Sequence, residues 1–138
     1  MQYITGIHAL NIPCHLDTCG DWHSTAIQWD DPTIDESKSS IFGDYGIEKN
    51  VQVPFLDNQK KYNVANHIRA LLDLMTENKL GIVQGMRDSY ICNDDYTQEI
   101  FDKVILLKKN DNWKEIDQLM SKEYMMKWIK FKGEHNNG

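Results

Sequence analysis

A helical pattern lies at the centre of the chain, where residues 63–75 read NVANHIRALLDLM. The apolar side chains recur at the spacing of one helical face, at Ala65, Ile68, Leu71, Leu72 and Met75. Asn63 is placed to cap the start of this helix, and Gly81 to end it. His67 and Arg69 lie off the apolar stripe, so we expect their side chains to be partly exposed, on a solvated face rather than, as the alternative, in a cleft.

The residues before this helix have the composition of strands and loops. Short runs of β-forming residues are separated by polar segments and by prolines, at 3–7, 25–29 and 51–53. The glycines of Gly43-Asp44-Tyr45-Gly46 indicate a tight turn. Residues 1–57 are therefore predicted to be rich in β-structure.

The residues after position 57 have a helical pattern up to residue 132. Further helices are expected to begin near Asp94 or Asp95 and near Asp111 or Asn112, whereas 80–91 fits either a strand or a helix. Residues 133–138 read as a flexible polar tail. Neither half is large enough to bury a core alone. We therefore predict one α+β domain over 1–138, with the β-rich part packed against the helical part and a linker candidate at 54–58.

Composition and charge exclude several classes of protein. Hydrophobic residues make up 41% of the chain and charged residues 26%, which is typical of a globular protein. The net charge of −6 makes nucleic acid an unlikely partner, because phosphate binding requires clustered basic residues. No apolar segment is long enough to predict a membrane span. The excess of lysine over arginine suggests an AT-rich bacterial genome.

Three cysteines occur, at positions 14, 19 and 92. Their odd number and the lack of a secretory leader predict free thiols in a reducing cytoplasm. Thus we expect all three cysteines to be unpaired.

Potential metal ligands are concentrated in one short segment. Within sixteen residues the chain carries His8, Cys14, His15, Cys19, Asp21 and His23. These side chains bind zinc and other transition metals, but the paired Cys-x-x-Cys spacing of structural zinc sites is absent. No cofactor is therefore expected, and zinc or another transition metal is the alternative.

The string Gly20-Asp21-Trp22-His23 combines an acid with an imidazole. An Asp–His pair can orient the imidazole for proton transfer or simply fix a loop. We favour the loop-fixing role, because no nucleophile motif, phosphate-binding glycine loop or H-E-x-x-H motif accompanies the pair. If the protein is an enzyme, the catalytic candidates are His8, Asp21 and His23.

The end of the chain alternates aromatic and basic residues. On a helix, Tyr124, Met125, Trp128 and Ile129 would form an apolar face and the lysines the opposite face. This is an ordinary amphipathic pattern, and a partner protein could also use such a helix.

Three stretches resemble small uncharacterised bacterial proteins. They are residues 6–11 (GIHALN), 20–23 (GDWH) and 63–69 (NVANHIR). Such proteins are sometimes encoded beside nucleotidyltransferase-like toxins of abortive-infection systems. The resemblance implies a protein-binding, antitoxin-like role and carries no site residues with it.

The sequence therefore favours a non-enzymatic interaction protein whose partner is another protein. The alternative is a small metal-binding protein or enzyme that uses the cluster in residues 8–23. An interaction protein should carry an exposed apolar patch, which we expect at the C-terminal helices. An enzyme should instead bring the cluster together in a pocket.

Overall fold

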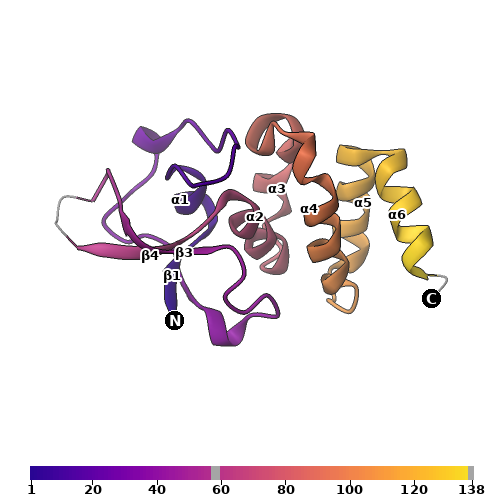
Figure 1. The fold of residues 1–138 in the computed structure, drawn as a ribbon, viewed down its shortest axis with the longest axis horizontal. Helices are drawn as coiled ribbons and strands as arrows, with labels where there is room; N and C mark the ends of the chain where they lie inside the picture. The colour runs from indigo at the N-terminus through magenta and orange to yellow at the C-terminus, as the bar shows by residue number, and fades with distance from the viewer. Residues whose placement is uncertain (57–59, 137–138) are drawn as a thin grey trace.

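The fold is α+β, as the sequence predicted, with a small sheet at one end and helices stacked away from it (Figure 1). A computed structural model describes residues 1–56 and 60–136. Helices α4, α5 and α6 follow one another away from the sheet, so the molecule is elongated and its C-terminus lies far from the sheet.

The sheet is mixed and has the strand order β2-β1-β4-β3. Its strands are β1 (Gln2–Ile4), β2 (Ile34–Glu36), β3 (Ile47–Gln52) and β4 (Lys61–Ala65). Strand β1 is antiparallel to β2 and parallel to β4, with Ile4 opposite Val64. Strand β4 corrects the prediction of a helical segment from residue 58 onward. Val64 and Ala65 are buried within the sheet, and this burial outweighs the helical spacing of the segment.

Two predicted strands of the N-terminal part were wrong in whole or in part. Only the beginning of 3–7 is extended, because Gly6–Leu10 forms the short helix α1, which buries Ala9 and Leu10 against α2. The segment 25–29 is not a strand, and a single 3₁₀ turn occupies Ser24–Ala26. The predicted turn at 43–46 is confirmed, since Gly43 and Gly46 both have positive φ.

The central helix, α2, spans His67–Thr76 and is buried on nearly all sides. It is capped by Asn66, whose side chain accepts a hydrogen bond from the Arg69 N–H at 2.9 Å, so the predicted cap at Asn63 was wrong. The predicted exposure of His67 and Arg69 was also wrong, because both side chains are buried. Helix α2 lies between α1 and the sheet on one side and α3 and α4 on the other, which accounts for its burial (Figure 1).

Arg69 is the centre of a buried polar network. Its side chain is 0% exposed. The guanidinium donates to Asp73 at 3.0 Å, to the hydroxyl of Tyr3 at 2.8 Å and to the carbonyl of Tyr45 at 2.6 Å. Asp73 also accepts hydrogen bonds from Tyr3 and Thr5, each at 2.7 Å. The network joins the first strand, the turn before β3 and helix α2.

The C-terminal part consists of short helices and two longer ones. They are α3 (Leu80–Val83), a π-helical turn (Met86–Ile91), a 3₁₀ turn (Asp94–Tyr96), α4 (Thr97–Val104), a second 3₁₀ turn (Ile105–Leu107), α5 (Trp113–Tyr124) and α6 (Met126–Asn136). Gly81 lies inside α3, so it does not end the preceding helix. Helix α6 continues to residue 136, so the polar tail expected from residue 133 is helical as far as that residue. Residues 137–138, and part of the linker candidate at 54–58, lie outside the described residues.

One apolar cluster runs through both parts of the chain. At its C-terminal end Phe101 of α4 contacts Tyr124, Trp128 and Phe131, with ring centroids 5.1–5.2 Å apart. These contacts attach α5 and α6 to the rest of the core. Within residues 1–56 and 60–136, no helix has the length and apolar character needed to cross a bilayer.

Candidate functional site

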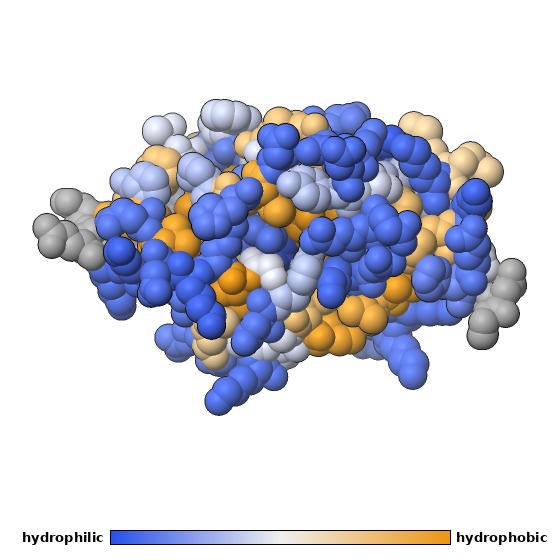
Figure 2. Space-filling model, viewed as in Figure 1, coloured by the Kyte–Doolittle hydropathy of each residue, from blue (hydrophilic) through white to orange (hydrophobic). Residues whose placement is uncertain are grey.

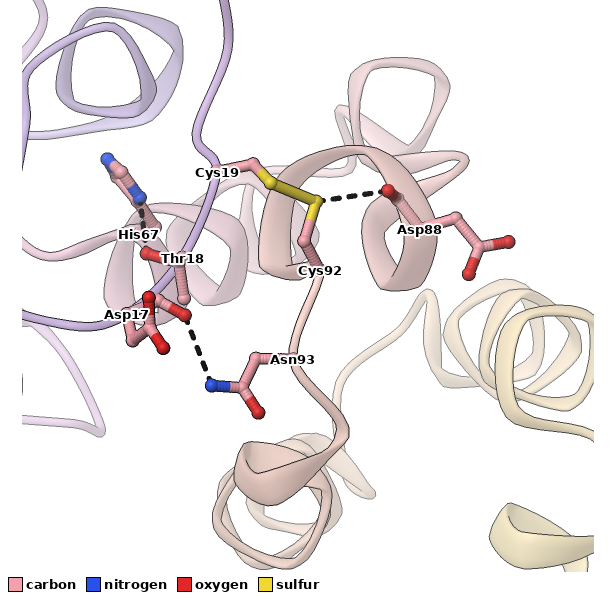
Figure 3. Close-up of a disulfide and its surroundings, with 7 residues drawn as sticks. All are labelled: Asp17, Thr18, Cys19, His67, Asp88, Cys92 and Asn93. Atoms are coloured by element: carbon pink, nitrogen blue, oxygen red, sulfur yellow. Dashed lines mark hydrogen bonds between the residues drawn. A yellow bond between two sulfur atoms is a disulfide. The ribbon is translucent and has the colours of Figure 1, made fainter.

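A disulfide joins Cys19 to Cys92 across 73 residues of sequence (Figure 3). It connects the loop after α1 to the end of the π-helical turn, and the hydrogen bond from Asn93 to the Asp17 carbonyl, at 3.2 Å, joins the same two segments. The prediction of three free thiols was therefore wrong, and only Cys14 is free. Disulfides persist mainly in oxidising compartments. The cytoplasmic prediction loses the support of free thiols and stays a prediction.

His8 fixes the fold at the start of the candidate cluster. Its Nδ1 accepts the backbone N–H of Thr33 at 3.2 Å, so the ring proton is on Nε2, which lies 2.7 Å from the carbonyl of Gln28. Both ring nitrogens are thus engaged within the protein. His8 and Asp21 share no hydrogen-bond partner among the described residues.

Asp21 and His23 form the predicted contact. The carboxylate lies 2.6 Å from Nδ1 of His23, and Asn11 braces both residues by donating to Asp21 and accepting the backbone N–H of His23. Burial raises the pKa of Asp21, but the hydrogen bonds from His23, Asn11 and the Trp22 amide outweigh burial and hold this pKa below its usual range. The side chain of His23 is 76% exposed. The arrangement fits the loop-fixing role.

The predicted metal ligands do not come together as one group among the described residues. Cys19 is bonded to Cys92, both nitrogens of His8 are engaged, and the exposed His15 ring lies 3.9 Å from Glu48. In the part of the chain that the structure describes, no three His, Cys, Asp or Glu side chains are grouped so that they could hold a metal ion.

A pocket of about 380 Å³ opens beside this loop. We call it the Cys14 pocket. Its exposed lining is more apolar than polar, and consists of Leu10, Asn11, Ile12, Pro13, Cys14, Thr18, Cys19, Asp21, Trp22, Ser24, Phe55 and His67. Of the three catalytic candidates, Asp21 lines this pocket, whereas His8 and His23 do not.

Inside the pocket a chain of contacts links the free thiol to a buried imidazole. The Sγ of Cys14 lies 3.6 Å from the hydroxyl of Thr18, which lies 2.7 Å from Nδ1 of His67. The other ring nitrogen, Nε2, lies 2.8 Å from the carbonyl of Ile12. Figure 3 shows the contact between Thr18 and His67 close to the disulfide. Gly20 packs on the same ring, because a Cβ at that position would lie only 2.7 Å from Cε1 of His67.

The thiol and the imidazole stabilise one another's charged forms. Burial raises the pKa of the Cys14 thiol, but hydrogen bonding to His67 and the charge of the imidazole outweigh burial and lower this pKa below its ordinary value. Burial likewise lowers the pKa of His67, but its interactions with Cys14 and the Ile12 carbonyl outweigh burial and raise this pKa. Both directions favour the thiolate and the imidazolium, and the Thr18 hydroxyl lies between the two groups.

The sequence indicated Cys14 only as a metal ligand, and it favoured a solvated face over a cleft for His67. The two residues are 53 positions apart in the sequence, and the helical pattern predicted an exposed position for His67. The one available signal was chemical: a free cysteine and a histidine are the residue types of a thiolate–imidazolium pair.

A second candidate surface lies where α5 meets α6. Met125, Met126 and Ile129 are 63%, 71% and 45% exposed. Figure 2 shows apolar colour gathered at the upper right of the molecule, over this junction. We call these three residues the α6 surface. Exposed lysines lie beside it, at positions 122, 127 and 130.

Met125 has a backbone conformation that ordinarily requires glycine. Its φ of 54° and ψ of −129° are unfavourable for a residue with a side chain. The side chain gains little from packing, because it is largely exposed. A strained junction therefore presents an apolar side chain to solvent.

Comparisons of this chain with models of protein families, with curated proteins and with solved structures found no match.

Proposed function

We propose that this protein is an interaction module that binds another protein, in the manner of an antitoxin, through the α6 surface. The exposure of Met125, Met126 and Ile129 carries the proposal, because large exposed apolar side chains grouped together are typical of contact surfaces. Methionine suits such a surface, since its flexible thioether adapts to the shape of a partner.

The partner is a protein with an apolar surface bordered by acidic residues. Met126, Ile129 and Lys130 share one face of α6 by their spacing, and Lys127 lies at its edge. Carboxylates on the partner would complement these lysines and favour its association over that of basic proteins. The resemblance to proteins encoded beside toxins indicates the product of the neighbouring gene as the first partner to test.

The proposal predicts that Ile129→Asp weakens the complex with the protein encoded beside this one by at least about tenfold, which corresponds to about 1.4 kcal/mol. The two proteins would be co-expressed and purified together, and their affinity measured by calorimetry. Leu106→Asp is the matched control, because Leu106 is also 45% exposed but lies on the 3₁₀ turn after α4. The affinity of the Leu106→Asp variant for the partner protein should be unchanged.

Two results would contradict the proposal. One is a complex that Ile129→Asp does not weaken. The other is a chain that binds only a second copy of itself through this surface, as light scattering would show.

A second prediction concerns the strained junction. Met125→Gly should raise the free energy of unfolding by about 1 kcal/mol, because glycine adopts this conformation without strain. Ile129→Gly, inside α6, should lower it by a similar amount, since glycine is unfavourable within a helix. Urea denaturation of both variants measures the difference. If Met125→Gly destabilises the protein as Ile129→Gly does, the junction is not strained.

The alternative function, an enzyme that uses the 8–23 cluster, is favoured by one observation. Cys14 belongs to that cluster and lies in a pocket with a buried histidine. Its partner, His67, comes from outside the cluster.

A further inference from the structure

We propose that Cys14 is a nucleophile activated by His67, and that it accepts an acyl group from a small ester or thioester bound in the Cys14 pocket. This activity is separate from partner binding at the α6 surface, which lies on other elements of the fold.

The arrangement meets the geometric needs of an activated thiol. Cys14 is partly exposed and is one of the residues that line the pocket. His67 is oriented by a third group: because Nε2 lies 2.8 Å from the Ile12 carbonyl, that nitrogen carries a proton and Nδ1 is directed to Thr18. A nucleophile, a base and a group that orients the base are the parts that covalent catalysis by cysteine requires.

The lining of the pocket defines the class of substrate. Phe55 and Trp22, which are 40% and 80% exposed, provide apolar surface on which a hydrocarbon acyl chain can pack, whereas Leu10 and Ile12 line the pocket but are almost fully buried. The volume of about 380 Å³ suits a small molecule. Asp21 adds a carboxylate to the lining, which disfavours an anionic substrate. The expected substrates are uncharged or cationic acyl donors.

The reaction balances without an added oxidant or metal. The thiol proton passes through the Thr18 hydroxyl to Nδ1 of His67, and the sulfur attacks the carbonyl carbon. A carbon–sulfur bond forms, the bond to the alcohol or thiol leaving group breaks, and His67 returns the proton to that group. Water then attacks the thioester with His67 as the base, which releases the acid and restores the thiol. Cys19 lines the same pocket but cannot replace Cys14, because its sulfur is held in the disulfide.

Two probes of the native protein test the proposal, without reductant so that the disulfide stays intact. Iodoacetamide reports the nucleophilicity of Cys14, and p-nitrophenyl acetate reports acyl transfer through release of nitrophenol and an acetyl group located by mass spectrometry. We expect alkylation of Cys14 at neutral pH about tenfold faster than that of free cysteine, together with an acetyl group on Cys14.

The variants separate activation from folding. His67→Gln and Thr18→Val should each slow alkylation toward the rate of free cysteine and move the midpoint of its pH profile up to that of an ordinary thiol. His15→Gln is the matched control: this histidine is next to Cys14 in sequence, but its side chain is 90% exposed, and the profile should not change. Asp21 in the pocket and Glu48, which contributes to the charge environment of His67, remain unaltered in all three variants.

The outcomes are decisive even if His67→Gln fails to fold, because Thr18→Val removes only the bridging hydroxyl. Alkylation of the native protein at the rate of free cysteine would overturn the proposal, as would an unchanged pH profile in Thr18→Val. Rapid alkylation without any acetyl transfer would also overturn it, since the thiol would then be activated for another class of chemistry.

Discussion

Replacing Arg69 with methionine should lower the free energy of unfolding by about 3–5 kcal/mol. The guanidinium is fully buried and donates to Asp73, Tyr3 and two backbone carbonyls, those of Gly43 and Tyr45. Methionine fills similar space but donates nothing. It would leave the Asp73 carboxylate buried without its cation and the two carbonyls without a donor.

The matched control is Arg87, the second of the two arginines in the sequence. Arg87 pairs with Asp94 at 3.0 Å, but these side chains are 22% and 55% exposed, so Arg87→Met should cost at most about 1 kcal/mol. Chemical denaturation of both variants gives the comparison. Adding Asp73→Asn to Arg69→Met should recover part of the loss, since no buried charge then remains unpaired. Equal losses in the two arginine variants would show that the network does not hold the fold together.

Removing the disulfide should lower the free energy of unfolding by about 4 kcal/mol. Cys92→Ser opens a loop of 73 residues. The conformational entropy that the unfolded chain regains when a loop of this length is opened corresponds to about 4 kcal/mol. The bond also holds the loop that carries Thr18 and Asp21 against the π-helical turn. Its loss should therefore widen the Cys14 pocket and slow the alkylation of Cys14.

Thermal unfolding with and without reductant measures this effect, and Cys14→Ser is the control. Reductant should lower the melting temperature of the native protein and of Cys14→Ser equally, and should have no effect on Cys92→Ser. Thiol titration of the denatured, unreduced protein should find one free thiol per chain. Three free thiols, with no response to reductant, would show that Cys19 and Cys92 are not bonded.

The two proposed activities are assigned to separate parts of the molecule. The Cys14 pocket lies beside α1 and the start of α2, whereas the α6 surface is at the opposite end, beyond α4 and α5 (Figure 1). Cys14→Ser should therefore leave partner binding unchanged, and Ile129→Asp should leave the thiol reactive. The failure of one proposal would not affect the other.

The sequence by itself determined the fold class and much of the C-terminal part. The change in composition near residue 57 predicted α+β, and the start of α5 follows Asn112 as expected. The glycines at 43 and 46 predicted their turn, and the Asp21–His23 contact follows from two complementary side chains two residues apart. These features depend on local backbone preferences and on neighbours in the chain, which a sequence shows directly.

Only the tertiary structure decided the rest. It placed 61–65 in the sheet, because the parallel pairing of β4 with β1 joins segments some sixty residues apart. It also buried His67 and Arg69, since helix α2 is covered on every side and polar residues there find partners in distant segments. The bond between Cys19 and Cys92, and the link from Cys14 through Thr18 to His67, likewise join segments that are distant in sequence. Helical spacing shows which residues share a face, but which faces are covered depends on contacts between segments that are distant in sequence.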